Sequence, residues 1–207
     1  MSLLIFACLI GVASAGCCIP KQWEGVEGML MGTVHWIKPR LTRGMLKVHW
    51  DATNQKLATN SSYDMDGKRF SLTTLEDYSQ GMQYIVMDDK CKKLKLNRTF
   101  PEGCIPDSAK ELGTYHLGAG SNTLDATSYY MKRGELETMI SVTKEGCIPL
   151  GEDTFGRFKR RSVLQTVSFA NISPGIQDPS VFDVPAACQQ DVSEDLESER
   201  VPSVFGF

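Results

Sequence analysis

The chain has 207 residues, of which 42% are hydrophobic and 23% charged, and its formal net charge is −3. The charge is too small for the basic footprint of a nucleic-acid-binding protein or for a strongly acidic body. About 190 residues remain after the leader described next, which fits one domain with a sizeable core.

The N-terminal segment predicts a secretory signal peptide over residues 1–15. Leu3 to Val12 is free of charge and is followed by Ala13-Ser14-Ala15, a small-x-small cleavage site. An apolar run of roughly ten residues is too short to span a bilayer, which needs about 20. A second apolar stretch long enough for a membrane anchor is missing from the sequence, so we expect a soluble protein that is secreted or lumenal. The alternative is a buried N-terminal strand or helix.

Cleavage at this site would remove Cys8 and leave an even number of cysteines. In an oxidising compartment an even number favours three disulfides, but six thiols allow 15 pairings and spacing alone cannot choose among them. A zinc site is poorly supported, because no pair has CxxC spacing and the histidines lie far apart in the sequence. The six cysteines are Cys17, Cys18, Cys91, Cys104, Cys147 and Cys188, and the histidines are His35, His49 and His116.

Three N-glycosylation sequons agree with a secreted protein. They begin at Asn60, Asn97 and Asn171, and Pro174 stiffens the acceptor segment of the third. Glycans at these positions would place each asparagine at the solvent surface.

Most of the body alternates apolar and polar residues, as half-buried strands do. The pattern runs through residues 46–50, 81–87, 91–96, 136–142 and 163–169, with a hairpin turn at Asp88-Asp89-Lys90. Pro106 to Leu112 is a candidate short helix. These elements predict a mainly β protein with an antiparallel sheet, curved or packed as two layers, and one or two short helices.

Catalytic signatures are missing from the sequence, so we predict that the protein is not an enzyme. The stretch 63–67 resembles the start of an EF-hand loop. However, Arg69 stands where that loop needs its invariant glycine, and Leu75 where it needs a bidentate carboxylate. Asp64 and Asp66 are therefore predicted as turn formers. Each histidine lacks a partner nearby in the sequence and is interpreted as a strand-face residue.

Two charged segments lie towards the C-terminal end. Arg157 to Arg161 fits the pattern of a proprotein convertase site, and could equally be a solvated basic turn or a patch for acidic glycans. Residues 189–207 are rich in acidic residues and lack apolar periodicity, which predicts a flexible acidic tail; a short helix there is the alternative. The folded domain is then expected to span residues 16–188.

Two motifs near the ends of this domain resemble those of the ependymin family. Residues 17–25 (CCIPKQWEG) are similar to its N-terminal signature. Residues 176–182 (IQDPSVF), with Pro185 and Cys188, are similar to its C-terminal signature. The segments 88–91 and 146–149 fall between them in matching order, so the resemblance covers nearly all of the mature chain.

The resemblance implies a fold like that of bacterial lipoprotein carriers, an antiparallel half-barrel whose concave face forms an apolar pocket. It also implies a secreted, N-glycosylated homodimer linked to calcium, in extracellular fluid, in matrix and adhesive contacts, or in the lysosomal lumen. By the same resemblance Cys17 pairs with Cys147 and Cys91 with Cys188. The double cysteine is more similar to invertebrate-type members than to the vertebrate form, where a different third bridge is expected. With the first two pairings made, Cys18 and Cys104 are left for the third bridge by elimination.

Calcium, as a cofactor, is implied by the resemblance and not by any local motif. The acidic residues are scattered, and no single loop offers the six to eight oxygens that calcium prefers. A site would therefore combine backbone carbonyls with carboxylates from distant segments, or rest partly on sialylated glycans. Asp64, Asp66 and Asp178 are the candidate protein ligands.

Two functions are consistent with these features. The first is a secreted glycoprotein that carries a hydrophobic molecule, such as a lipid or fatty acid, in an apolar pocket. The second is an extracellular matrix, cell-adhesion or signalling glycoprotein without a carried ligand, in which the same apolar residues fill a closed core. The pocket face is expected to include some of Leu46, Val48, Trp50, Met82, Tyr84, Val86, Leu136, Ile140, Val167 and Phe169.

Overall fold

The structure is a computed structural model that describes residues 17–35, 37–101, 103–158 and 161–189. The predicted signal peptide, with Cys8, lies outside the described residues, as does the predicted acidic tail beyond residue 189. Two residues of the basic segment 157–161 are also outside them.

The described chain is almost entirely β-structure, as predicted. Its strands form one antiparallel sheet in the order β6-β5-β4-β3-β2-β1-β11-β10-β9-β8-β7. The strands are β1 (Gln22–His35), β2 (Lys38–Asp51), β3 (Lys56–Met65), β4 (Lys68–Asp77), β5 (Met82–Met87), β6 (Lys90–Lys95), β7 (Lys110–Ala119), β8 (Asn122–Arg133), β9 (Leu136–Thr143), β10 (Pro149–Phe158) and β11 (Arg161–Pro174).

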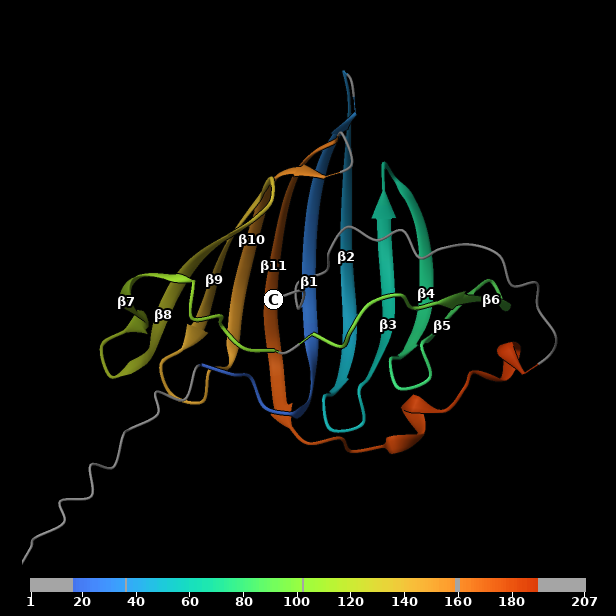
Figure 1. Ribbon diagram of the computed structural model, residues 1–207. Coiled ribbons are helices and arrows are strands. Elements are labelled where there is room, and N and C mark those ends of the chain that lie inside the picture. Colours follow the sequence, from blue (N-terminus) through green and yellow to red (C-terminus); the bar gives the residue numbers. More distant parts are fainter. Residues whose placement is uncertain (1–16, 36, 102, 159–160, 190–207) are drawn as a thin grey trace, which may run out of the picture.

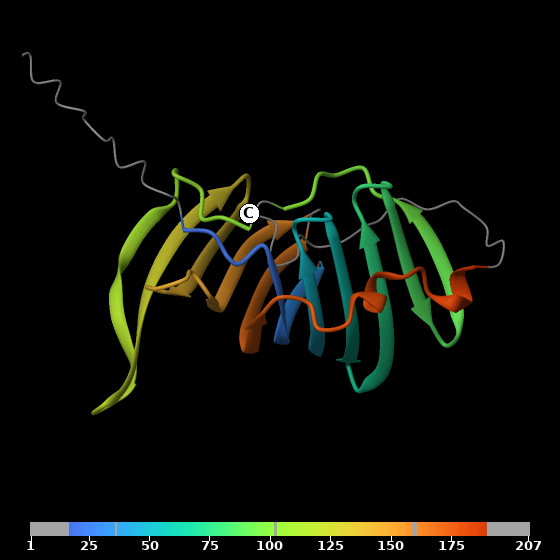
Figure 2. The same cartoon turned by 90° about the horizontal axis from the view of Figure 1, so that it is seen from below.

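The sheet is curved and does not close into a barrel (Figure 1, Figure 2). Its first and last strands, β1 and β11, pair in the middle, whereas β6 and β7 form its two outer edges. Because β6 and β7 follow one another in the chain, residues 96–109 must cross the whole sheet. Figure 2 shows this crossover on the hollow side of the sheet.

The hairpin expected around residues 88–90 is confirmed. Strands β5 and β6 pair from Met82 with Lys95 to Met87 with Lys90, which leaves Asp88 and Asp89 as a two-residue turn. Both aspartates have positive φ, 49° and 58°, as a turn of this length requires when it follows the right-handed twist of its strands. The strands predicted around residues 46–50, 136–142 and 163–169 are present as parts of β2, β9 and β11.

Two tryptophans organise the hollow side of the sheet, which we call the inner face. Trp23 and Trp50 are register partners on β1 and β2, are fully buried, and stack with ring centroids 6.4 Å apart. Ile19 joins their cluster, and Phe100 of the crossover packs on Trp50 at 4.6 Å. Residues 17–21, which we call the N-terminal segment of the fold, and the crossover therefore cover the inner face at the end where β1 begins.

The opposite side of the sheet, the outer face, has a separate apolar cluster. Residues 175–188 follow β11 and include two short 3₁₀ helices, η1 (Pro179–Phe182) and η2 (Ala186–Cys188). Phe182 of η1 packs against Leu75 and Tyr84, which are buried on β4 and β5. The C-terminal segment thus covers the outer face near β3 to β6.

Three disulfides connect these covering segments to the sheet. They join Cys17 to Cys147 and Cys91 to Cys188, the two pairings implied by the family resemblance, and Cys18 to Cys104, the pair left by elimination. The adjacent cysteines hold the N-terminal segment to two places, the turn after β9 and the crossover. In the chain-entropy model, loops of this size contribute about 4–5 kcal/mol each.

The prediction of a short helix from Pro106 to Leu112 is wrong. Residues 106–109 form a turn closed by a hydrogen bond from Ala109 N to Pro106 O, 2.8 Å, and β7 starts at Lys110. The local sequence tolerates a helix, but pairing of β7 with β8 satisfies the same backbone groups in the sheet. The two short helices that do form lie in the C-terminal segment.

Candidate functional site

The sheet register assigns each predicted pocket residue to one of the two faces. Register pairs carry their side chains on the same side, so the Trp23–Trp50 pair fixes the inner face for its neighbours. The predicted residues on the inner face are Leu46, Val48, Trp50, Leu136, Ile140, Val167 and Phe169. Met82, Tyr84 and Val86 lie on the outer face, where they pack with the C-terminal segment.

The inner face continues beyond the tryptophan cluster towards the other ends of the strands. Tyr63 and Phe70 stack there with ring centroids 5.4 Å apart. A side chain at Gly44 would collide with the Tyr63 ring, since an added Cβ would lie 2.6 Å from it. The glycine therefore lets this ring lie against the sheet. Other apolar side chains of the inner face, Leu46 on β2 and Leu136 on β9, are half-buried.

Two carboxyl groups stand among these apolar side chains. Glu27 of β1 and Glu152 of β10 are 6% and 7% exposed, and only β11 separates their strands. Two strand spacings put their backbones roughly 10 Å apart. Thr154 Oγ1 donates a hydrogen bond of 3.0 Å to Glu152 Oε1, whereas Glu152 Oε2 is buried without a partner among the described residues.

Burial changes the acidity of both groups. Desolvation raises the pKa of Glu27 to about 8. Burial likewise raises the pKa of Glu152 to about 8, against the opposing effect of the hydrogen bond from Thr154. The carboxyl groups are therefore largely protonated at neutral pH and can both donate and accept hydrogen bonds within an apolar surrounding.

Such an arrangement suits binding rather than covalent chemistry. An apolar surface with a few polar groups is typical of sites for small hydrophobic molecules, where the polar groups fix the orientation of the ligand. Here the aromatic and aliphatic side chains would contact a hydrocarbon chain, and the carboxyl groups would contact a polar head.

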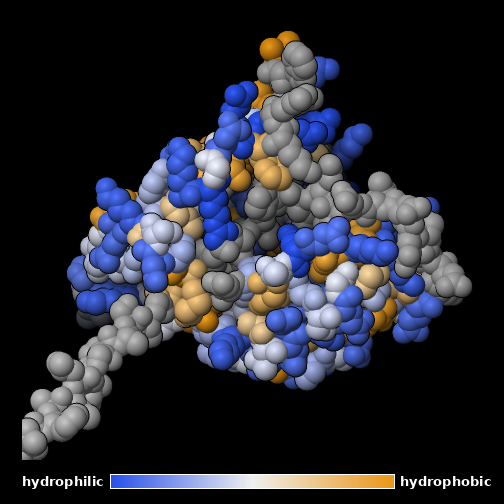
Figure 3. All heavy atoms as spheres, in the orientation of Figure 1, coloured by the Kyte–Doolittle hydropathy of each residue, from blue (hydrophilic) through white to orange (hydrophobic). Residues whose placement is uncertain are grey.

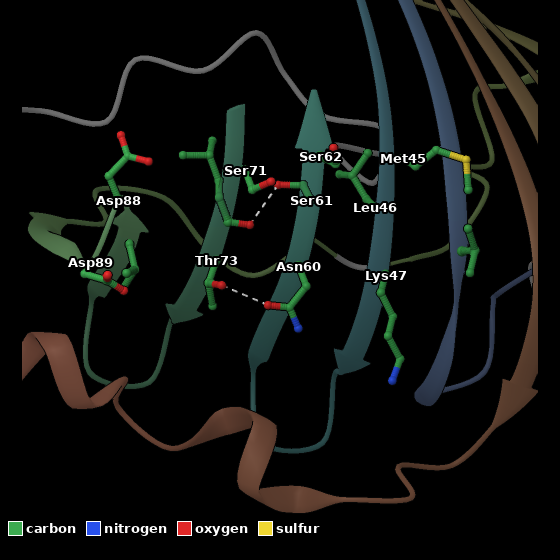
Figure 4. A pocket seen from close by; sticks show the side chains of 13 residues that line it. Met45, Leu46, Lys47, Asn60, Ser61, Ser62, Ser71, Thr73, Asp88 and Asp89 are labelled. Carbon is green, nitrogen blue, oxygen red and sulfur yellow. Dashed lines mark hydrogen bonds between the residues drawn. The ribbon is translucent and has the colours of Figure 1, made fainter. Parts of the chain in front are cut away.

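A groove of about 640 Å³ lies on the outer face. Figure 4 views it from that side, so the strands run from β4 to β1 in the reverse order of Figure 1. Lys47, Asn60 and Thr73 form one row across it, and Ser62 and Ser71 belong to the next. Serine, threonine and asparagine side chains line it together with the longer Lys47 and the apolar Val26, Met45 and Val86.

Asn60 makes this groove a poor place for a hydrophobic ligand. The side chain of this sequon residue is exposed in the groove, with its oxygen accepting a hydrogen bond of 2.9 Å from Thr73 Oγ1 (Figure 4). A glycan on Asn60 would therefore occupy the groove. Asn97 and Asn171, the other two sequon residues, are also exposed.

The three aspartates proposed for calcium do not converge. Asp64 accepts a hydrogen bond of 3.0 Å from Gly67 N, and Asp66 accepts one of 3.2 Å from Leu41 N, so both shape the β3–β4 turn. Asp178 instead accepts from Ser180 N at 3.0 Å and caps η1. Within the described ranges, no group of three or more His, Cys, Asp or Glu residues could hold a metal ion.

The fold gives two histidines a carboxylate partner that is distant in sequence. His49 is buried on the outer face with Nδ1 3.1 Å from Glu24 Oε1, and that oxygen also accepts a hydrogen bond of 3.0 Å from Gln177 N. This contact ties the C-terminal segment to β1 and β2. His116 lies 2.6 Å from Asp125 on the exposed β7–β8 hairpin.

The sequence analysis missed Glu27 and Glu152. A strand over residues 22–35 was not predicted, although period-two alternation from Trp23 through Gly25 to Glu27 would have put this glutamate on the tryptophan side. For Glu152 no local signal was available, because a glutamate in an alternating strand ordinarily faces solvent.

Comparison with known proteins identifies the family. The Ependymin family model matches residues 66–188. A development-specific protein, LVN1.2, of Lytechinus variegatus is 30% identical over 167 residues, which cover 72% of this chain and 88% of that protein. The chain belongs to the ependymin family.

Two further relatives match over most of the chain. Ependymin-related protein 1 of Haliotis asinina is 26% identical over 89% of this ependymin-family chain and 96% of its own length. Mammalian ependymin-related protein 1 of Mus musculus is 25% identical over 87% of the chain and 83% of its own. A LolA-superfamily protein of Nitrosomonas europaea aligns over 80% of this chain and 92% of its own, with 9% identity and a TM-score of 0.32.

The buried carboxyl groups predict a specific pH dependence of stability. Each has a pKa of about 8 in the folded state against an ordinary value of 4.5, so the folded state binds more protons between these limits. The contribution of these two groups to the free energy of unfolding should be fully present below pH 4.5 and fall by about 1.4 kcal/mol per pH unit for each carboxyl as the pH rises to 8.

Urea unfolding followed by circular dichroism at pH 5 and pH 8 measures this slope. Glu27→Gln and Glu152→Gln should each reduce it, whereas Glu135→Gln, at an exposed turn, should leave it unchanged. An equal slope in the wild type and in the double glutamine variant would contradict the assignment.

Proposed function

We propose that this protein is a secreted glycoprotein that binds a hydrophobic ligand, such as a lipid or fatty acid, on the inner face of its sheet, without enzymatic activity. One observation carries the proposal. The inner face extends as a surface of half-buried apolar side chains past the tryptophan cluster, where the N-terminal segment and the crossover cover the sheet. The extracellular space, or a lumen such as that of the lysosome, is the compartment that sequons and disulfides favour.

The energetics of burial are sufficient for such a role. Moving an acyl chain from water to this surface would contribute about 0.8 kcal/mol per CH₂ group. Ten buried groups would correspond to about 8 kcal/mol, which is micromolar affinity before ordering costs. Catalytic machinery is not needed for this.

The ligand-binding face can be tested with two variants on one strand. Leu136 and Met139 both belong to β9 but lie on the inner and outer face respectively. Leu136→Asp should weaken uptake of a fluorescent fatty acid at least about tenfold, because an aspartate there places a charge against the acyl chain. Met139→Asp should bind like the wild type, since Met139 is 38% exposed on the other side.

Fluorescence titration of the secreted, folded variants gives the affinities. Equal loss of uptake in both variants would contradict the inner-face assignment. A wild type that takes up no fatty acid or lipid would favour the second function instead, a matrix, adhesion or signalling glycoprotein without a carried ligand.

We further propose that the protein forms a homodimer through the outer face of its central strands. Leu30, Met45 and Leu164 are 47%, 61% and 58% exposed there, on neighbouring strands. Gly28 and Gly32 lie between them and leave the surface flat. An apolar face on a sheet whose other side already packs its core is typical of a protein interface, and a flat face can pair with a second copy of itself.

A positive charge placed on this apolar surface should separate the subunits. Leu164→Lys should move the dimer to the monomer in sedimentation velocity at micromolar concentration, because each interface would then contain two buried cations. Lys92→Leu on the edge strand β6 is a control that should leave the association unchanged. A wild type that sediments as a monomer would refute the proposal.

For calcium we propose a contribution from the glycans at Asn60, Asn97 and Asn171 rather than from the three aspartates, since these carboxylates cap turns and do not meet. Titration calorimetry should then detect calcium binding to the glycosylated protein and lose it after enzymatic deglycosylation. Undiminished binding to the deglycosylated protein would show a protein-borne site instead.

A further inference from the structure

Charge is distributed unevenly between the two ends of the strands. The turns β1–β2, β3–β4, β8–β9 and β10–β11 all lie at one end, as the register shows: Val34 pairs with both Pro39 and Ser162, and Asp66 bonds to Leu41. Figure 1 shows this end uppermost, with the β1–β2 hairpin reaching furthest. Its basic side chains, which we call the basic rim, are Lys38, Arg40, Arg43, Lys68, Arg69, Lys132, Arg133, Arg157 and Arg161.

All side chains of the basic rim are exposed. This end also includes the β5–β6 turn, and its acidic residues are Asp64, Asp66, Asp88, Asp89, Glu135, Glu137 and Asp153. They are fewer than the basic residues, and two of them pair with rim residues: Asp64 with Arg69 at 3.8 Å, and Glu137 with Lys132 at 3.2 Å. Among the residues described, Lys38, Arg40 and Arg43 form no ion pair. The rim therefore keeps a positive excess in a chain whose net charge is −3.

Apolar side chains protrude at the same end. Ile37, at the tip of the β1–β2 hairpin, is 89% exposed, and Val34 beside it is 41% exposed. Figure 3 shows hydrophobic (orange) side chains at the top of the molecule with hydrophilic (blue) ones around them. At the other end of the strands the β2–β3 and β4–β5 turns, residues 52–55 and 78–81, contain no charged residue.

We propose that the basic rim and the Ile37 tip bind the surface of a membrane that contains anionic lipids. Lysine and arginine near such a surface each contribute about 1 kcal/mol, and an exposed apolar tip inserts at the headgroup boundary. A soluble anionic glycan would also be attracted by the charges, but it offers no apolar layer for Ile37 and Val34. Among the described residues no helix is long and apolar enough to cross a bilayer, so this contact is peripheral.

The contact goes beyond the proposed carrier function and does not depend on it. A membrane-bound rim would hold the protein at a source of hydrophobic ligands, with the inner face starting directly below the rim. Leu136 marks this continuity, because its register partners are Arg133 of the rim and Gly156, next to Arg157.

Co-sedimentation with vesicles tests the proposal. The wild-type protein should sediment with phosphatidylcholine vesicles that contain phosphatidylserine, should remain in solution with phosphatidylcholine alone, and should be released by high salt. Lys38→Glu with Arg40→Glu should reduce the partition coefficient at least about 25-fold, at about fivefold per lost cation. Lys92→Glu with Lys95→Glu changes the net charge equally on β6, away from the rim, and should have a much smaller effect.

A second pair of variants tests the contribution of the apolar tip. Ile37→Ser should weaken sedimentation with the anionic vesicles, whereas Val184→Ser, at a 36% exposed residue of the C-terminal segment, should not. Leu136→Ser, which removes the apolar side chain without adding a charge beside the rim, should still sediment, which separates failure of ligand uptake from failure of membrane binding. Equal effects of the two charge reversals, no effect of Ile37→Ser, or binding to immobilised heparin without binding to vesicles would overturn the proposal.

Discussion

The stacked pair of Trp23 and Trp50 is the contact on which the arrangement of this protein depends. An open sheet has two faces and two edges, and an isolated pair of long strands in its middle would have little to pack against. These two rings bring together the first two strands, the N-terminal segment through Ile19, and the crossover through Phe100. The crossover in turn connects the two edges of the sheet, so its anchoring decides how the edges are held relative to the centre.

The disulfides stabilise what the hydrophobic contacts alone hold weakly. The described residues of the N-terminal segment and of the crossover have no regular secondary structure apart from one bridge between Cys18 and Cys104. Their backbone bonds, Ile19 N to Gly103 O at 2.8 Å and Ile105 N to Cys17 O at 2.7 Å, surround that bridge on both sides. The covalent link and the hydrogen bonds thus fix the same register, which places Phe100 and Ile105 on the inner face.

Sequence alternation predicts the strands of this protein well and their faces less well. Leu46, Val48 and Trp50 alternate in a way that requires one common face, and the family resemblance implies a concave one. Met82, Tyr84 and Val86 alternate just as regularly, but their burial comes from residues 175–188, nearly a hundred positions away. A strand pattern states which residues share a face and cannot state which face a remote segment will cover. The same limit hid Glu152, whose burial depends on its neighbours across the sheet.

The outer and inner faces therefore differ in kind although both contain apolar residues. On the outer face the groove carries a sequon, and the C-terminal segment is held by Glu24, which accepts from Gln177 N while contacting His49. On the inner face, among the described residues, Glu152 Oε1 accepts a hydrogen bond from Thr154, whereas Glu152 Oε2 has no partner. Burial raises the pKa of both Glu27 and Glu152, so protonation offsets much of the free-energy cost of burying them. A carboxyl oxygen without a protein partner can gain from a ligand that brings a hydrogen-bond donor or acceptor. That asymmetry is the physical reason to place a ligand with a polar head and an apolar chain on the inner face rather than in the outer groove.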